Sequence, residues 1–144
     1  MDNEVEILFV EDNAEDAELT IRSLRRNNVA NKLVHLKNGA EAIEYIFEDE
    51  SGKAIRNLKL ILLDLKMPKL NGMDVLRELK ASEKTKEIPV VILTSSNQDP
   101  DIEACYRLGA NSYIVKPVGF EPFTKAISDL GLYWMLLNSH PRNL

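Results

Sequence analysis

The chain has 144 residues, of which 28% are charged and 44% hydrophobic, with a formal net charge of −5. This length fits one domain, taken as residues 1–144 with a core over about 4–138 and a short tail at 139–144, and the acidic balance argues against a nucleic-acid surface. No apolar run approaches the ~20 residues of a membrane span, the N-terminus lacks signal-peptide features, and the single Cys105 cannot form an internal disulfide, so we expect a cytoplasmic location without a membrane partner.

Apolar runs and turn residues predict five strands that alternate with five helices. In chain order we expect a strand at 5–10, a helix over about 14–27, a strand at 32–36, a helix opening at 38–39, a strand at 60–64, a helix over about 72–81, a strand at 89–93, a helix from Pro100, a strand at 112–115 and a helix from about 120 to 137. This alternation indicates the α/β class, with a doubly wound five-stranded parallel sheet.

Two segments stand apart from this regular pattern. Residues 48–57 are polar and predict a surface loop lengthened by insertion. The last helix is expected to carry a core-facing stripe through Leu130 and Trp134, while Tyr133, Met135 and Leu136 lie largely off it. This C-terminal stretch therefore serves either as extra core or as the face of a homodimer.

The residues just beyond the carboxyl ends of four predicted strands are acidic, hydroxylic or basic. They are Glu11, Asp12, Asp64, Thr94 and Lys116. If the strand order is 2-1-3-4-5, the first and third strands are neighbours and the three carboxylates converge at the switch point of the sheet. Three like charges repel by ~1 kcal/mol or more per pair at about 4 Å even in bulk water, so they call for a cation, and all-oxygen ligation suits Mg²⁺.

Each of these residues also has a simpler interpretation when it is taken alone. Glu11 and Asp12 directly precede a predicted helix, and acids are common at helix N-termini. Asp64 fits a turn. Lys116 could be a solvated lysine and Thr94 a β-forming residue at a strand end. Only the combination favours a site.

The order and spacing of these residues resemble the receiver domain of two-component response regulators. The resemblance rests on the acidic pair, on Pro68 and Gly72 four and eight positions after Asp64, on Thr94 thirty positions after it, on Tyr113, and on Lys116-Pro117. It spans about residues 4–138 and implies a flavodoxin-like fold with strand order 2-1-3-4-5. The long segment before the third strand and the stretch Trp134 to Asn138 resemble the single-domain regulators that partner bacterial phytochromes.

The resemblance implies that Asp64 is the phosphoacceptor and receives its phosphoryl group from a sensor histidine kinase, possibly of phytochrome type. Asp12 and Asp64 would bind Mg²⁺ (or Mn²⁺) directly, Glu11 would act mainly through water, and the main-chain carbonyl of Lys66 would complete the protein ligands. Lys116 would add a second positive charge beside the phosphoryl oxygens. The protein would then be no enzyme beyond its own phosphorylation and dephosphorylation.

The resemblance also implies how the signal leaves the site. Thr94 would bond the new phosphoryl group, and Tyr113 would move into the vacated space. The face formed by the fourth helix, the fifth strand and the fifth helix would then bind a downstream protein target. Lys66 and Ser96 would tune hydrolysis, while Gly72 and a cis peptide at Pro117 would be structural. No attached output domain is expected.

Three other functions compete with this one. A Mg²⁺-dependent phosphohydrolase with an aspartate nucleophile wants a second acid two residues later, where this chain has Lys66. A flavin- or nucleotide-binding protein wants a glycine-rich loop after the first strand, where residues 11–16 are anionic. A receiver that no longer takes phosphate is disfavoured because every expected position is filled.

Overall fold

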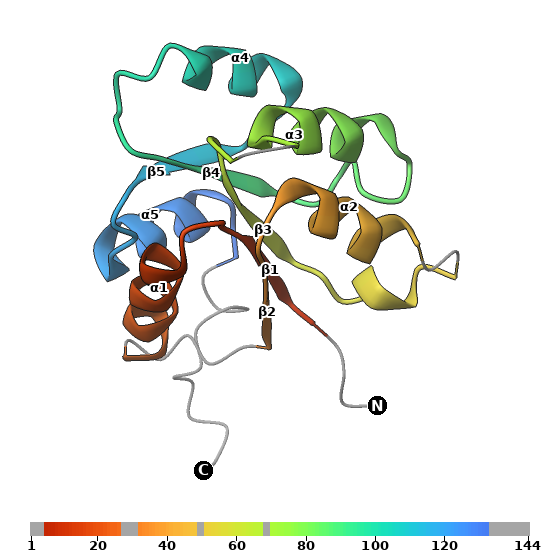
Figure 1. The fold of residues 1–144 in the computed structure, drawn as a ribbon, viewed down its shortest axis with the longest axis horizontal. Coiled ribbons are helices and arrows are strands. Elements are labelled where there is room, and N and C mark those ends of the chain that lie inside the picture. The colour runs from red at the N-terminus through yellow and green to blue at the C-terminus, as the bar shows by residue number, and fades with distance from the viewer. Residues whose placement is uncertain (1–4, 27–31, 49–50, 68–69, 133–144) are drawn as a thin grey trace.

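Five parallel strands form one sheet, and helices cover both of its faces (Figure 1). The computed structural model describes residues 5–26, 32–48, 51–67 and 70–132. Its strands are β1 (Ile7–Val10), β2 (Leu33–Leu36), β3 (Leu60–Asp64), β4 (Val90–Thr94) and β5 (Ser112–Val115). Its α-helices are α1 (Ala14–Arg26), α2 (Gly39–Phe47), α3 (Gly72–Ala81), α4 (Asp101–Leu108) and α5 (Phe120–Asp129). The strand order β2-β1-β3-β4-β5 confirms the predicted flavodoxin-like sheet.

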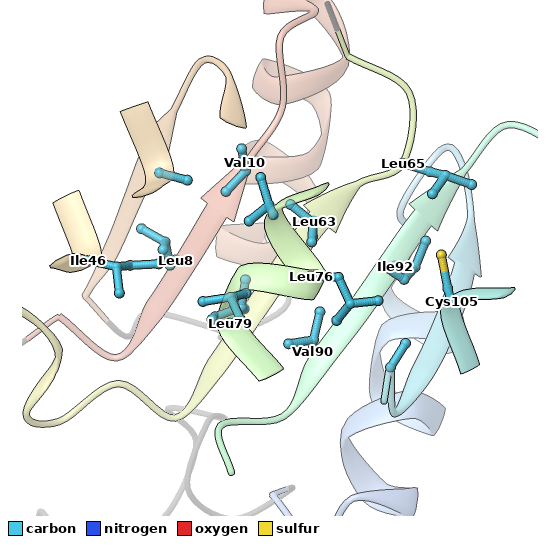
Figure 2. Packing of buried hydrophobic residues seen from close by; sticks show 14 of the residues in the cluster. Leu8, Val10, Ile46, Leu63, Leu65, Leu76, Leu79, Val90, Ile92 and Cys105 are labelled. Carbon is cyan, nitrogen blue, oxygen red and sulfur yellow. The ribbon is translucent and has the colours of Figure 1, made fainter. Parts of the chain in front are cut away.

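Two apolar clusters hold the layers together, one on each face of the sheet. Ala17 and Leu24 of α1 pack with Phe123 and Ile127 of α5 on one face. Figure 2 shows the other face, where α2, α3 and α4 bury their side chains against the central strands. Every residue of β1, β3 and β4 is buried, which explains why these strands are continuous apolar runs in the sequence. Among the described helices, none has the length and apolar character to cross a bilayer.

The helix α3 begins unusually close to the end of β3, and Gly72 makes this approach possible. A Cβ atom at Gly72 would lie 2.3 Å from the main-chain oxygen of Asp64 and 2.8 Å from Cα of Leu65. The Gly72 amide also donates to the Leu65 carbonyl at 3.0 Å. The structural role predicted for Gly72 is therefore to let the start of α3 lie directly against the backbone of Asp64 and Leu65, where a side chain would not fit.

We expect Gly72→Ala to lower the free energy of unfolding by about 1–3 kcal/mol, because the added methyl group meets backbone that must shift. Urea denaturation measures this change. Gly119→Ala is the matched control, since the nearest atom to its Cβ would be Pro122 Cδ at 3.7 Å, and it is expected to cost less than about 1 kcal/mol. Equal stability of the two variants would contradict this role of Gly72.

The structure corrects the predicted ends of two helices. Asp101 rather than Pro100 is the first residue of α4, and Asp99 Oδ1 accepts a hydrogen bond from the Asp101 amide at 2.8 Å. The last helix ends at Asp129, well before the predicted residue 137. Gly131 adopts φ +75°, and the amides of Gly131 and Leu132 donate back to the carbonyls of Ser128 and Ile127, which is a Schellman cap.

The periodic apolar stripe hid this helix end, because Leu130 continues the stripe while lying next to the left-handed glycine. Leu130 and Leu132 still pack against the apolar cluster that α1 and α5 form on one face of the sheet, so apolar residues after the helix fill the core as the pattern indicated. The predicted dimer face covers Leu130 to Leu137, and its residues 133–137 lie outside the described residues, as do Asn138, the tail at 139–144 and Pro68.

The predicted loop at 48–57 contains a short 3₁₀ helix, Lys53–Ile55, in its described part. Ile55 is buried in the cluster under α2 and α3, which anchors this segment to the body of the domain. Cys105 is buried in the same cluster, as a small apolar side chain would be, and burial followed by the charges of Asp101 and Asp99 raises its pKa to about 11.

Candidate functional site

The acidic site is built by two neighbouring strands that end side by side. Val10 of β1 is paired in register with Leu63 of β3, so the next residues, Glu11 and Asp64, emerge together at the carboxyl edge of the sheet. Glu11, Asp12 and Asp64 each offer a carboxylate oxygen, and these atoms lie within 4.8 Å of one another. The predicted convergence of the three carboxylates is therefore present.

Lys116 lies among the acids and contacts carboxylates from three segments. Its Nζ lies 3.1 Å from Glu11 Oε1, 3.4 Å from Asp64 Oδ1 and 3.4 Å from Asp16 Oδ2. The Lys116 amide donates to the Thr94 carbonyl at 2.7 Å, which holds the backbone that carries the lysine. The Lys116-Pro117 peptide is cis, as the resemblance implied.

Burial and charge set the protonation of this site. The side chains of Glu11 and Asp64 are only 1% and 3% exposed, whereas that of Lys116 is 18% exposed. Burial raises the pKa of Asp64 to about 7, and the negative charge of Glu11 adds to this effect while Lys116 opposes it. Burial disfavours the charged form of Lys116, but the carboxylates of Asp64, Glu11 and Asp16 outweigh it and raise the lysine pKa.

These residues fit a hard divalent cation. Four carboxylates, those of Glu11, Asp12, Asp16 and Asp64, lie around one ammonium group, which leaves excess negative charge in a partly buried cluster, and oxygen donors suit Mg²⁺ or Mn²⁺. Asp12 is exposed while Glu11 and Asp64 are buried, so the cluster opens to solvent at Asp12, where waters could complete the coordination. The contribution of the Lys66 carbonyl stays a prediction.

The Thr94 hydroxyl is buried and occupied by its own loop. Its single hydrogen is shared between the Ser96 carbonyl at 3.1 Å and Asp99 Oδ2 at 3.4 Å, and its oxygen accepts from the Ser96 amide at 3.3 Å. Thr94 thus stands one residue beyond Leu93, the Cα partner of Asp64, with its hydroxyl bonded to the loop between β4 and α4. The described contacts of Ser96 are with this loop and with the Gln98 amide.

Tyr113 is half-buried on β5, at the end of the sheet covered by α4. Its ring packs edge-on against Tyr106 of α4, with ring centroids 6.3 Å apart and an interplanar angle of 79°. Tyr106 and Val115 are among the most exposed large apolar side chains of the described residues, at 44% and 36%. Apolar and aromatic groups therefore gather where the predicted output face lies.

The sequence did not single out three residues that the structure adds to the site. Asp16 contacts Lys116, but an acid in the first turn of a helix is ordinary and gave no signal. Nε2 of His35 lies 2.8 Å from the Glu11 main-chain oxygen, and its ring lies against Phe9. Asp99 contacts both Thr94 and Lys66.

Comparison with known proteins gives close relatives along almost the whole chain. The probable methanogenesis regulatory protein FilR2 of Methanothrix harundinacea is 38% identical over 136 residues, which cover 94% of this chain and 86% of the relative. The response regulator Rcp1 of Synechocystis is 33% identical over 129 residues, covering 90% of this chain and 88% of Rcp1.

Solved structures agree with these relatives. The bacteriophytochrome response regulator AtBRR is 43% identical with a TM-score of 0.81, covering 94% of this chain and 99% of that chain. The Mn²⁺-bound form of Rcp1 is 32% identical with a TM-score of 0.71, covering 94% and 96% of the two chains. The family model described as the response regulator receiver domain matches residues 7–128. This match, together with the fold, shows that the chain belongs to the response regulator receiver domains of two-component systems.

Proposed function

We propose that this protein accepts a phosphoryl group on Asp64 from a histidine kinase and that phosphorylation changes a protein-binding face. The observation that carries the proposal is the Lys116 ammonium group 3.4 Å from Asp64 within a cluster of three carboxylates. Phosphoryl transfer depends mainly on positioning and on neutralising the phosphoryl oxygens, and this site supplies a nucleophile and positive charge together.

In the proposed reaction a carboxylate oxygen of Asp64 attacks the phosphorus of a phosphohistidine. The new bond is an acyl phosphate, and the phosphorus–nitrogen bond breaks with its electron pair left on the imidazole of the kinase. A Mg²⁺ ion held by Asp12 and Asp64, with Glu11 acting through water, would neutralise phosphoryl oxygens. Lys116 then turns its ammonium group from the carboxylates toward the same oxygens.

The partners follow from the family and from the named relatives. AtBRR is a bacteriophytochrome response regulator, which supports a phytochrome-type kinase as the phosphoryl donor. We further propose a cytoplasmic protein that acts on a downstream protein and not on nucleic acid, and that turns over no substrate beyond its own acyl phosphate. Lys66 stands where a phosphohydrolase of the aspartate-nucleophile class would place a second acid.

Intact-mass spectrometry tests this function directly. Incubation of the protein with Mg²⁺ and acetyl phosphate is expected to add the mass of one phosphoryl group, and EDTA is expected to prevent the gain. Asp64→Asn is expected to stay unmodified, while Asp129→Asn, an exposed acid on α5, serves as the matched control and gains the group. A mass gain that persists in Asp64→Asn would contradict the proposal.

Thr94→Ala is expected to separate phosphorylation from response. The acyl phosphate still forms, because Asp64, Asp12 and Lys116 are retained, but the hydroxyl that would bond the phosphoryl group is missing. Hydrogen exchange of α4 and β5 is therefore expected to change on phosphorylation of the wild type and to change several-fold less in the variant. An equal change in both proteins would count against Thr94 as the coupling residue.

A further inference from the structure

A second polar connection links the loop after Asp64 to the start of α4, and Lys66 is its centre. Lys66 Nζ lies 3.6 Å from Asp99 Oδ2 and 3.8 Å from Asp101 Oδ2. Lys66 follows Asp64 by two residues. Asp99 is the residue before Pro100, and Asp101 is the first residue of α4. The lysine therefore spans from the phosphoacceptor loop to a different segment of the chain.

Asp99 gathers two hydrogen-bond donors and one ammonium group around its carboxylate. Its Oδ1 accepts from the Asp101 amide at 2.8 Å, and its Oδ2 accepts from the Thr94 hydroxyl at 3.4 Å and faces Lys66. The carboxylate thus joins the switch hydroxyl, the first amide of α4 and the lysine beside the phosphoacceptor. We expect a change at any one of these groups to alter how firmly the start of α4 is held.

The burial of Asp99 distinguishes this pair from the other ion pairs of α4. The Asp99 side chain is 7% exposed although that of Lys66 is 65% exposed, so the pair has one nearly buried partner, the carboxylate. The Arg107–Glu103 pair on the same helix has side chains that are 68% and 84% exposed, and such a pair contributes little. Removing Lys66 leaves the nearly buried Asp99 carboxylate without its cation, whereas removing Arg107 leaves the exposed Glu103 carboxylate to be solvated by water.

We propose that Lys66 is a positioning residue that, with Asp99, latches the first turn of α4 to the β3–α3 loop in the unphosphorylated protein. The release of this latch rests on the proposed function, because it requires phosphorylation of Asp64. When the Thr94 hydroxyl turns to a phosphoryl oxygen on Asp64, Asp99 loses a donor and the first turn of α4 loosens. The signal then reaches α4 through Lys66 and Asp99 as well as through Thr94 and Tyr113.

The resting latch is tested without any phosphoryl group, by amide hydrogen exchange of residues 102–105 in three variants. Lys66→Met keeps the length of the side chain and removes its charge, and we expect exchange at these amides to become at least threefold faster. Lys66→Arg restores a cation and is expected to return the rate to within about twofold of the wild type. Arg107→Met, the matched control, is expected to leave the rate unchanged.

Equal exchange in Lys66→Met and the wild type would overturn the latch, as would an equal acceleration in Arg107→Met. Urea denaturation of the same proteins separates a local effect from global destabilisation. A fall in the free energy of unfolding large enough to account for the faster exchange, with exchange accelerated throughout the sheet, would also overturn it.

The release step is tested with Mg²⁺ and beryllofluoride, a phosphoryl mimic that binds aspartate. In the wild type we expect exchange at residues 102–105 to accelerate when the adduct forms, and in Lys66→Met to change much less because the turn is already loose. An equal acceleration in both proteins would overturn the release. Failure of beryllofluoride to bind Asp64 would instead contradict the proposed function, while the exchange of the unphosphorylated variants still decides the resting latch.

Discussion

Replacing Lys116 by methionine is expected to slow phosphorylation of Asp64 by about a hundredfold or more. The reason is that the ammonium group lies 3.4 Å from the acceptor oxygen, where negative charge moves during transfer, and losing one such preorganised donor typically costs ~10²–10³ in rate. The measurement is the initial rate of the phosphoryl mass gain with acetyl phosphate at saturating Mg²⁺.

The same variant is expected to bind Mg²⁺ at least as tightly as the wild type. Lys116 competes with the metal for Glu11 and Asp64, so its removal leaves the carboxylates more negative. Lys125→Met is the matched control, because Lys125 is an exposed lysine that pairs with Asp129 on α5, and it should phosphorylate at the wild-type rate. A wild-type rate in Lys116→Met would show that the lysine is no part of the transfer.

Asp64→Asn is expected to raise the free energy of unfolding of the metal-free protein by about 2 kcal/mol at pH 8. The wild type must hold a buried carboxylate beside Glu11, whereas asparagine has the same shape without the charge. A pKa of about 7 against the ordinary value of 3.8 corresponds to at most ~4 kcal/mol at ~1.4 kcal/mol per pKa unit. This pKa already includes the opposing attraction of Lys116, so ~4 kcal/mol is an upper bound on the gain and the ion pair is not subtracted again.

The pH dependence of this difference has a definite sign. The folded state raises the pKa of Asp64, so it binds more protons than the unfolded state between pH 3.8 and about 7. The stability that this group contributes is fully present below pH 3.8 and is lost as the pH rises through about 7. The advantage of Asp64→Asn is therefore expected to grow from pH 4 to pH 8.

Urea denaturation in EDTA across this pH range measures the effect, with the exposed Asp129→Asn as control. Added Mg²⁺ is expected to stabilise the wild type at pH 8 and to stabilise Asp64→Asn much less, because binding to the folded state alone raises stability by mass action. A difference between Asp64→Asn and the wild type that does not change with pH would contradict the raised pKa.

The fold could be predicted from the sequence because burial on both faces leaves a clear signature. The short apolar run at 60–63, which ends at Asp64, identifies a central strand. The helix α3 has the predicted bounds of 72 and 81. The predicted end of α5 was wrong because the apolar periodicity continues past Gly131 into the core. Gly131 itself was the stronger signal, because a glycine directly after a helix commonly adopts the left-handed conformation that ends it.

The site was predictable where strand ends determine it and not where side chains choose partners. Parallel strands must deliver Glu11 and Asp64 to the same edge of the sheet, so their convergence follows from strand order. The contact of Asp16 with Lys116 and of Asp99 with Lys66 depends on how loops and helix ends turn. Spacing along the chain carries no information about such contacts between distant segments.

Locating the phosphoryl group on the chain tests the central claim most directly. Borohydride cleaves an aspartyl phosphate by reducing its carbonyl carbon, which converts the aspartate to homoserine, and peptide sequencing by mass spectrometry then identifies the position. We expect homoserine at residue 64 alone, formed only when Mg²⁺ and the phosphoryl donor are both present. Homoserine at residue 12, or a reduced side chain at Glu11 with Asp64 intact, would contradict this assignment of the acceptor.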